Sequence, residues 1–312
     1  MMARASKQQQ GVSVVVVTYW TGLVLKENLE ALRRQRNVRE IIYVDNGNPV
    51  SVQNWLDEMA KKYKKIKVVR PARNTGFAAG CNLGVAHASG DFIALVNPDC
   101  IVETGTFTKA LGIFRKSKDA WLLGANLVGL DGKEQRGSRR EILTPWRACV
   151  EVLRLDRIAP NHPYFKRFHQ FESEPVEGNQ PVPTVSGAFM VIRRVAYERV
   201  GGMDENLFLH LDDSDICMRM GLLGGQILFC SNLPVIHHLS TSDVSRTFIE
   251  WHKARGTNYF FYKHYNGIYP YWFLVFVSLL VWSRFSLLAP FLLIRDLPDM
   301  FSRRRRRKAE VW

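Results

Sequence analysis

The chain opens with a β-branched apolar run and then alternates between strand-like and helix-like hydrophobic patterns. Ser13 to Thr18 is apolar at almost every position, which is typical of a strand buried on both faces. The same reading predicts further strands over 41–44, 66–69 and 92–96, and helices over 24–35, 52–63 and 76–88. Strands that alternate with helices at these lengths indicate βαβ units, so we expect an α/β fold with a largely parallel central sheet flanked by helices.

The pattern weakens in the second half of the chain. Residues 129–183 are charged and contain prolines, which predicts an excursion that covers or shapes a site. Regular patterns then return, and they predict an ordered stretch over 184–192, helices up to 200 and over 213–223, and strands over 226–230 and 234–238.

Polar residues stand where three of the predicted strands end. The first strand ends at Thr18-Tyr19, the second at Asp45-Asn46 and the fourth at Asn97-Pro98-Asp99. Ligands of open α/β sheets bind beyond the carboxyl ends of the strands. We therefore expect these side chains to gather on one edge of the sheet.

Two phosphate-binding motifs are absent from the sequence. It contains no GxxxxGK[ST], and the first strand is not followed by GxGxxG, which disfavours a P-loop enzyme or a dinucleotide dehydrogenase. A divalent cation held by carboxylates is another way to bind a nucleotide diphosphate. Asp99 is placed for that role, with a turn-forming aspartate as the alternative.

An acidic cluster begins the helix predicted over 213–223. Asp212, Asp213 and Asp215 place three carboxylates in four residues, which repel one another unless a cation or a catalytic role compensates. Helix capping is the alternative, since acidic groups stabilise a helix N-terminus. Capping accounts for one or two of the three, so we expect one carboxylate to act as a general base.

These pieces belong to an ordered series of motifs. The series is Val17-Thr18-Tyr19, Val44 to Gly47, Asn74 to Asn82, Leu95 to Asp99, Ser186 to Met190, Gly202 to Glu205 and Leu211 to Arg219. It resembles the family 2 glycosyltransferases, is most similar to their rhamnosyltransferase-like branch, and covers about residues 12–240. The resemblance implies the GT-A fold, with a mostly parallel central sheet flanked by helices and with C-terminal membrane-associating helices.

The resemblance also implies a role for each matching residue. The residues implied to bind the donor are Thr18, Tyr19, Asp45, Asn74, Gly76, Phe77, Asn82 and Asn97. Among them Asp45 would contact the nucleoside, while Asn97 stands at the first acidic position of the family's DxD motif and leaves one fewer anionic ligand.

The remaining implied roles concern the metal, the base and the acceptor. Asp99, at the last DxD position, would ligate Mg²⁺ or Mn²⁺, and His237 matches a histidine that ligates the metal in some relatives, with His238 as the adjacent candidate. Asp213 matches the second acid of the family's Glu-Asp pair, the catalytic base. Asp212 and Asp215 are assigned to the acceptor, with capping as the alternative.

The implied reaction is a direct displacement with inversion, in which the base takes the proton of an acceptor hydroxyl. The donor would be a nucleotide-diphospho-sugar, dTDP-rhamnose being the first choice and a UDP- or GDP-sugar the alternative. The acceptor would be a lipid-linked or cell-surface glycan. On this basis 12–125 is a nucleotide-sugar-binding half, 126–245 an acceptor-binding and catalytic half, and 246–312 a membrane-associating helical region with a polybasic tail.

Charge and cysteine content refine the picture. The net charge of +14 favours anionic partners, and six of the charges form one run, Arg303 to Lys308. A basic nucleic-acid-binding protein is the less favoured alternative. It would interleave basic and stacking aromatic residues on the fold body, whereas the strongest basic run here follows an apolar segment, so we expect no nucleic-acid partner. A nucleotidyltransferase would need a basic loop near the first strand, and Thr18 to Gly22 offers none. Five widely spaced cysteines without a CxxC pair fit a reducing compartment.

The C-terminal region predicts contact with a membrane. Tyr265 to Ser283 carries no formal charge, and Arg284 separates it from a second uncharged run that ends at Ile294. The positive-inside rule keeps the polybasic run in the cytoplasm, and the catalytic body is expected there too, because Met1 to Gly11 lacks the apolar core of a secretory signal. A single crossing of the membrane would put the two on opposite faces. We therefore expect a re-entrant hairpin or an interfacial helix at the cytoplasmic face of the inner membrane, with a buried core helix as the alternative.

Overall fold

The computed structural model describes residues 11–158, 162–165, 177–239 and 244–309 of the chain, and for 298–309 the helical backbone alone. Most of the N-terminal segment and the side chains of the polybasic run, on which two of the predictions rest, lie outside the described residues. The strands are β1 (Val12–Thr18), β2 (Val38–Asp45), β3 (Ile66–Val69), β4 (Phe92–Val96), β5 (Cys100–Val102), β6 (Ala120–Val128), β7 (Arg139–Arg140), β8 (Asn179–Pro181), β9 (Thr184–Val185), β10 (Phe189–Arg193) and β11 (Gln226–His237). The helices are α1 (Val24–Arg33), α2 (Val50–Lys62), α3 (Phe77–Ala86), α4 (Thr106–Lys116), α5 (Pro145–Leu153), α6 (Arg194–Arg199), α7 (Asp212–Leu222), α8 (Arg246–Tyr265) and α9 (Tyr271–Ala309).

One sheet runs through the body of the molecule, in the order β3-β2-β1-β4-β10-β6-β11-β5, with β8 beside β11. The predicted α/β fold is confirmed, and β3, β2, β1 and β4 are all parallel. The other half of the sheet is mixed, which the sequence did not predict. Phe189 at the start of β10 lies opposite Val96 at the end of β4, so β10 enters from the carboxyl edge and runs antiparallel.

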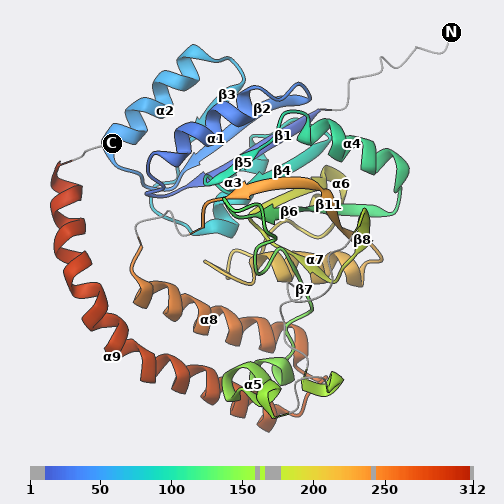
Figure 1. The fold of residues 1–312 in the computed structure, drawn as a ribbon, viewed down its shortest axis with the longest axis vertical. Helices are drawn as coiled ribbons and strands as arrows, with labels where there is room; N and C mark the ends of the chain where they lie inside the picture. The colour runs from blue at the N-terminus through green and yellow to red at the C-terminus, as the bar shows by residue number, and fades with distance from the viewer. Residues whose placement is uncertain (1–10, 159–161, 166–176, 240–243, 310–312) are drawn as a thin grey trace.

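Helices cover both faces of this sheet (Figure 1). Helices α1, α2 and α4 bury their apolar stripes on one face, with β1 contributing Val12, Val14 and Val16. Helices α3, α6 and α7 pack on the other face, against Val15 and Val17. Alternate residues of β1 therefore serve opposite layers, which explains why the strand is apolar at almost every position.

Several boundaries differ from the predicted ones. The two strands predicted over 226–238 are one strand, β11, whose register shifts between Cys230 and Pro234. The excursion over 129–183 contains a helix, α5. The predicted boundary at 125 falls inside β6, so the proposed nucleotide-sugar-binding half and the proposed acceptor-binding and catalytic half share one sheet. The boundary at 245 coincides with Ser245, the N-cap of α8.

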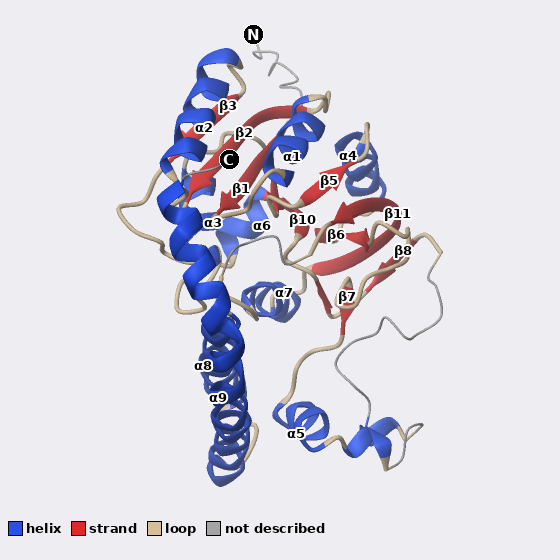
Figure 2. Ribbon diagram, turned by 60° about the vertical axis from the view of Figure 1, so that its left-hand side comes forward, coloured by secondary structure: helices blue, strands red, loops and turns tan. Residues whose placement is uncertain are grey.

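A third apolar cluster lies apart from the sheet and joins α5, α8 and α9. Helices α8 and α9 form a hairpin in which they lie side by side (Figures 1 and 2). Among the described helices, α9 contains a stretch that is long and apolar enough to cross a membrane, Tyr271–Leu297. The hairpin contacts the body through the segment that precedes α7 and through Asp215 in the acidic cluster of α7.

Candidate active site

The ends of β1 and β2 lie together as predicted, and Asn46 joins them to the loop before α3. Thr18 is paired with Asp45 in the parallel register. The Asn46 side chain donates to Asn74 Oδ1 at 2.8 Å and accepts from Thr75 N at 3.0 Å. The sequence placed Asn46 at a strand end but did not predict that it organises this loop.

Asp45 is built into a tight turn at the end of β2. Its carboxylate is buried and accepts from Asn48 N at 2.9 Å and from Arg70 Nε at 2.8 Å. Tyr19 lies against Gly47 in the same turn. The carboxylate is thus fixed in orientation at the edge of the sheet where the donor is predicted to bind.

Gly76 closes the same loop onto the segment before α7. Its φ is +87°, and a Cβ at this position would lie 2.6 Å from Phe208 O. Phe77 N donates to the same carbonyl oxygen at 2.9 Å. Only glycine allows this approach without strain, so the predicted donor loop and the acidic helix are held together at this point.

Asn82 has a different environment from the other predicted donor residues. Its amide donates to Met203 O at 2.9 Å and to Glu205 Oε1 at 2.8 Å, and its Oδ1 accepts from Tyr197 Oη at 2.6 Å. These contacts tie α3 to the turn that precedes α7. A donor contact by Asn82 stays a prediction, since the amide already has protein partners.

Asp99, in the turn before β5, comes together with His237, the last residue of the adjacent strand β11. The two residues flank the β5–β11 pairing, and Asp99 Oδ1 lies 3.4 Å from His237 Nε2. Gln135 Nε2 donates to His237 O at 2.6 Å, so its Oε1 accepts from His237 Nδ1 at 2.9 Å. With the ring proton on Nδ1, Nε2 presents a lone pair toward the carboxylate.

Two acceptor atoms that converge in this way fit a shared cation. Asp99, Cys100 and His237 each offer a ligand atom, and these atoms lie within 4.8 Å of one another. The Cys100 thiol is the least suitable, because burial and the neighbouring Asp99 charge raise its pKa well above its usual value. The carboxylate oxygen and the imidazole nitrogen suit Mn²⁺ or Mg²⁺. Gln135, which the sequence did not reveal, orients the histidine as an outer partner does in metal sites.

The acidic helix begins in a strained backbone. His210 and Leu211 both have positive φ, +68° and +63°, although neither is glycine. Such conformations cost free energy and persist only where the surroundings determine them. They turn the chain sharply, so that Asp212 and Asp213 enter the first turn of α7 with both side chains buried.

Asp213 lies between a positive charge and a backbone amide. Its Oδ2 accepts from Arg140 Nη2 and from Gly187 N, the latter at 2.8 Å, and its Oδ1 accepts from Ser214 N at 2.7 Å. Burial raises its pKa, but the Arg140 charge and these donors outweigh burial, so the pKa of Asp213 is lowered. Burial and the charge of Asp213 together raise the pKa of Asp212. Arg140 comes from the excursion and was not among the predicted site residues.

The segment Gly187-Ala188 connects the acidic helix to the end of β4. Gly187 N donates to Asp213, while Ala188 O accepts from Asn97 N at 2.8 Å. Asp213 and Asn97 therefore flank two consecutive residues, although they are far apart in the sequence. The predicted base and the DxD-like turn are brought to one site.

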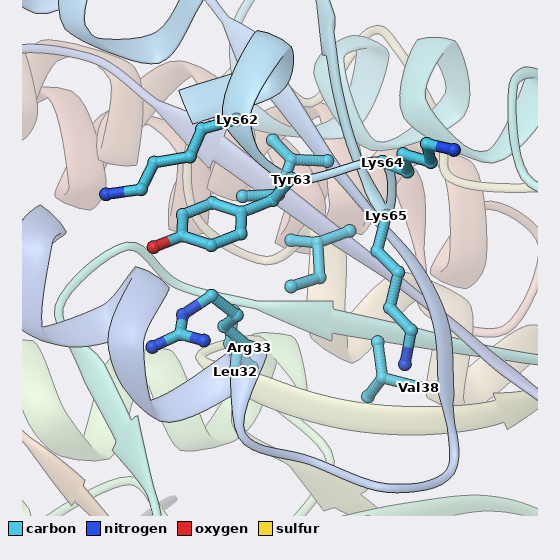
Figure 3. Close-up of a pocket in the computed structure, with 9 residues that line it drawn as sticks. Leu32, Arg33, Val38, Lys62, Tyr63, Lys64 and Lys65 are labelled. Carbon is cyan, nitrogen blue, oxygen red and sulfur yellow. The ribbon is translucent and has the colours of Figure 1, made fainter. Parts of the chain in front are cut away.

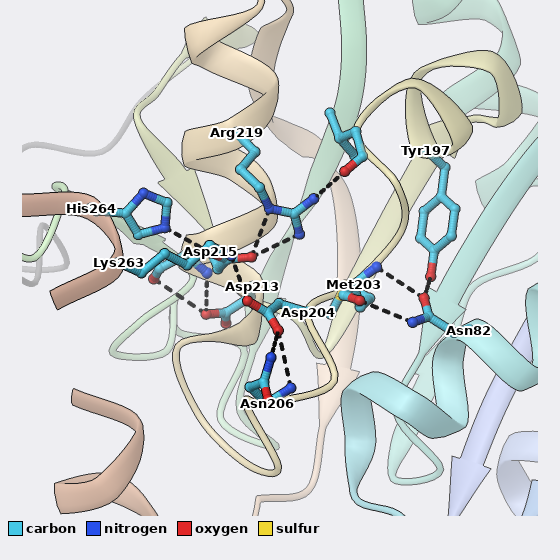
Figure 4. A network of polar contacts seen from close by, with 12 residues as sticks. Asn82, Tyr197, Met203, Asp204, Asn206, Asp213, Asp215, Arg219, Lys263 and His264 are labelled. Atoms are coloured by element: carbon cyan, nitrogen blue, oxygen red, sulfur yellow. Dashed lines mark hydrogen bonds and ion pairs between the residues drawn. The ribbon is translucent and has the colours of Figure 1, made fainter. Parts of the chain in front are cut away.

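Asp215 points the other way, into an ion-pair cluster between α7 and α8 (Figure 4). Its side chain has no exposed surface, and its oxygens lie 2.6 Å from Lys263 Nζ, 2.7 Å from His264 Nε2 and 2.8 Å from Arg219 Nε. Lys263 also contacts Asp204 Oδ2 at 2.6 Å. Although burial opposes it, the hydrogen bonds from His264 and Lys263 lower the pKa of Asp215. We call Asp204, Asp215, Arg219, Lys263 and His264 the anchor cluster.

A separate cavity of 210 Å³ lies at the opposite ends of β2 and β3, between Arg33, Tyr63 and three lysines (Figure 3). It contains none of the predicted site residues. Parallel strands place their amino ends at the edge away from Asp45, so this cavity is remote from the candidate site.

Comparisons with known proteins decide the family. The profile of glycosyl transferase family 2 matches residues 13–201, most of the described body. The chain belongs to this family. It is 26% identical over 242 residues to the N-acetylglucosaminyl-diphospho-decaprenol L-rhamnosyltransferase of Mycobacterium tuberculosis, covering 73% of this chain and 76% of the relative. It is 21% identical to Rhamnosyltransferase WbbL of Escherichia coli, covering 77% and 89%. The resemblance to the rhamnosyltransferase-like branch is thus confirmed.

Solved structures confirm the GT-A type of fold. The mannosyltransferase PcManGT of Pyrobaculum calidifontis, solved with GDP-Man and Mn²⁺, superposes with a TM-score of 0.55 at 16% identity, covering 95% of this chain and 75% of that one. At this identity the likeness concerns the fold alone. The comparisons therefore show that the chain is a family 2 glycosyltransferase, while the roles of its individual residues stay predictions.

Proposed function

We propose that this glycosyltransferase moves a sugar from a nucleotide diphosphate donor to a lipid-linked glycan acceptor, with inversion at the transferred carbon. The observation that carries the proposal is the placement of Asp213 and Asn97 on either side of Gly187-Ala188. Rhamnose from dTDP-rhamnose is the donor we favour, because two relatives are named as rhamnosyltransferases. The acceptor class follows the name of the M. tuberculosis relative, a sugar on a diphospho-decaprenol.

Asp99 and His237 would hold the divalent cation, Mg²⁺ or Mn²⁺. When bound, the cation would supply charge neutralisation to the departing diphosphate. Gln135 keeps the proton on His237 Nδ1 and so leaves Nε2 available. Asp45, Thr18 and Tyr19 would receive the nucleoside at the adjacent strand ends, and the loop from Asn74 to Phe77 would face the donor.

Asp213 would act as the general base. The acceptor oxygen attacks the anomeric carbon, its proton passes to an Asp213 carboxylate oxygen, and the bond to the diphosphate breaks with both electrons leaving on the diphosphate. A lowered pKa keeps Asp213 ionised before the acceptor arrives. Because Arg140 and Gly187 both bind Oδ2, the acceptor must displace or share one of these donors to reach that oxygen.

The two other acids receive different roles. We assign an acceptor contact to Asp212, which is buried beside Asp213 and carries a raised pKa, so that it shares a proton with the acceptor more readily than its neighbour. Asp215 was given the same role from the sequence. Its carboxylate is surrounded by Arg219, Lys263 and the imidazole of His264, so we propose that it anchors α7 instead.

The test is a screen of nucleotide sugars for transfer to polyprenyl-diphosphate-linked sugars, with Mn²⁺ and with excess chelator. Asp213→Asn is expected to bind donor and metal but to lose transfer by about 10²–10⁴-fold, the usual contribution of a general base. Asp119→Asn, an exposed aspartate on the body, is the matched control and should transfer at the wild-type rate. Wild-type transfer by Asp213→Asn would remove the base assignment, and full activity in chelator would remove the metal role of Asp99 and His237.

We further propose that the enzyme works at the cytoplasmic face of the inner membrane, where a lipid-linked acceptor meets a soluble nucleotide sugar. The apolar surface of α9 supports this location. Fractionation of cells that express the full chain tests it. Recovery of the protein in the soluble fraction at low and high salt would contradict it.

A further inference from the structure

Helix α9 has two unlike faces along its described length. Leu274, Val277 and Val281 are buried against α5 and α8. The opposite face carries apolar side chains in solvent, three to eight residues apart and on one side of the helix: Trp272, Phe276, Leu279, Leu287 and Ile294. The side chains of Trp272 and Leu287 are 70% and 81% exposed. At a helical rise of about 1.5 Å per residue, this outward face is about 33 Å long.

Between Tyr271 and Leu297, where its side chains are described, α9 keeps its charged residues off the outward face. Arg284, Arg295 and Asp296 project on the half of the helix that is turned toward the protein, by the helical period of 3.6 residues. Ser283 is the polar residue that falls within the outward row. A helix with this distribution of side chains fits the membrane interface, where one side is apolar and the other is water.

Two polar contacts fasten α9 along α8. Arg284 Nη1 lies 3.0 Å from Glu250 Oε2. Further along, the buried carboxylate of Asp296 accepts from Thr247 N at 3.1 Å and from Thr247 Oγ1 at 2.9 Å, and so caps the first turn of α8. The contacts lie at separate points of the stretch that is long enough to span a bilayer.

These contacts are incompatible with a transmembrane position of α9. To span, the helix would have to leave α8, break both polar contacts and expose Leu274, Val277 and Val281. If it kept α8, it would carry Glu250, Lys253 and other charged residues of that helix into hydrocarbon, at several kcal/mol for each charge at the bilayer centre. Neither cost arises if the helix lies flat.

We propose that the α8–α9 hairpin is an in-plane membrane platform, which lies on an anionic lipid surface through the outward face of α9. The lipid is the occupant that the charges favour, since the sequence continues from this face into Arg303 to Lys308. Helix α5 packs on α9, and it follows in the sequence the strand that carries Arg140. The platform therefore presents the active site close to the surface from which a lipid-linked acceptor arrives, and in this respect the inference deepens the proposed function.

Vesicle binding by the full chain tests the surface. We expect the protein to float with vesicles of phosphatidylcholine and phosphatidylglycerol, and to bind pure phosphatidylcholine and high-salt samples less. The double variant Leu279→Glu, Leu287→Glu should lose about tenfold or more of this binding. Val195→Glu, an equally exposed apolar residue on α6, is the control and should bind as wild type. Equal binding by the double variant and wild type would overturn the proposal.

Depth measurements separate a flat helix from a crossing one. Spin labels are placed on single cysteines at positions 272, 279, 287 and 294, and the five native cysteines are buried and label poorly. A flat helix gives similar shallow depths of about 5–10 Å at all four positions. A maximum depth at 279 and 287, with shallow ends, would show a span and overturn the proposal.

Light scattering without vesicles tests the competing occupant, a second copy of the chain. A stable dimer that Leu287→Glu dissociates would overturn the assignment to lipid. Donor and acceptor are absent from all three measurements, so their failure leaves the proposed transfer reaction standing. Conversely, an inactive protein that binds vesicles as expected would refute the reaction alone.

Discussion

Asp213 and Asp215 stand two residues apart on the first turn of α7, and both are buried, yet their surroundings differ. Asp213 is held by Arg140 from β7 and by amides of Gly187 and Ser214. Asp215 is held by the cationic side chains of Arg219 and Lys263 and by the imidazole of His264, the last two from α8. The pKa of each carboxyl is lowered, so both are ionised at neutral pH.

The difference separates a carboxylate that holds the fold from one that is placed to react. The partners of Asp215 come from α7 and α8, and Lys263 connects onward to Asp204, so moving any one of them disturbs the whole anchor cluster. Within the described residues, Asp213 has one charged side chain among its hydrogen-bond donors, Arg140, and this comes from a two-residue strand. An anionic or hydroxyl-bearing ligand competes for Arg140 far more easily than for the cations around Asp215.

Asp215→Asn should have the largest effect on stability. The variant leaves Lys263, His264 and Arg219 without their shared anion, and breaking a buried ion pair on one side costs about 3–5 kcal/mol. We expect the free energy of unfolding to fall by this amount in denaturant titrations, while folded protein still turns over donor.

The matched control is Glu30→Gln, which breaks the more exposed Glu30–Arg33 pair on α1. That change should cost at most about 1 kcal/mol. If Asp215→Asn is as stable as wild type but fails to transfer sugar, the contrast between the two carboxylates collapses. Asp215 would then return to the acceptor role that the sequence suggested.

The sequence predicts the parallel half of the sheet well, because each strand there is a short, nearly uninterrupted apolar run between helices. It does not predict that β10 runs antiparallel. That direction depends on the path of the excursion over 129–183, whose sequence is weakly periodic. The single long helix α9 was divided at Arg284 for a related reason. The charge interrupts the apolar run, yet it finds Glu250 on α8, a partner that only the tertiary structure supplies.

The candidate site shows the same limit. Asp99, His237 and Asp213 were predicted from the resemblance, because each matches a residue of the family's pattern. Gln135 and Arg140 have no local signal, since each acts through a side chain about 70 to 100 positions away. Such partners become visible only when the fold brings the segment from Gln135 to Arg140 beside β11 and α7.

Gln135→Leu tests whether the candidate active site includes a metal ion held by Asp99 and His237. Loss of the acceptor for His237 Nδ1 frees the ring to rotate or change tautomer, and outer partners of metal-ligating histidines are worth about 10–100-fold in metal affinity. We expect Mn²⁺ binding, followed by electron paramagnetic resonance, to weaken by that factor.

Gln135→Glu keeps an acceptor at the same position and should retain Mn²⁺ affinity to within a few-fold. The anchor cluster is unaffected by either change, so both variants should unfold at similar denaturant concentrations. Unchanged Mn²⁺ affinity in Gln135→Leu would show that His237 is not a ligand. The residues proposed to react would then be Asp213 and its neighbours alone.

Arg140→Gln is the finest test of the comparison, because it removes the one cationic side chain that binds Asp213. The pKa of Asp213 is lowered in the wild type, so transfer should be sustained as the pH falls until Asp213 is protonated, below its ordinary value. An opposite charge at this range lowers a carboxyl pKa by about 1–3 units. We therefore expect the acid limb of the pH–rate profile to move to higher pH by about one unit or more in Arg140→Gln.

Arg140→Lys keeps the charge and should leave the limb near its wild-type position, whereas Asp215→Asn should move it little because Asp215 faces the anchor cluster. A limb that stays in place in Arg140→Gln, together with loss of transfer in folded Asp215→Asn, would reverse the two roles and would make the carboxylate between α7 and α8 the one that takes the proton.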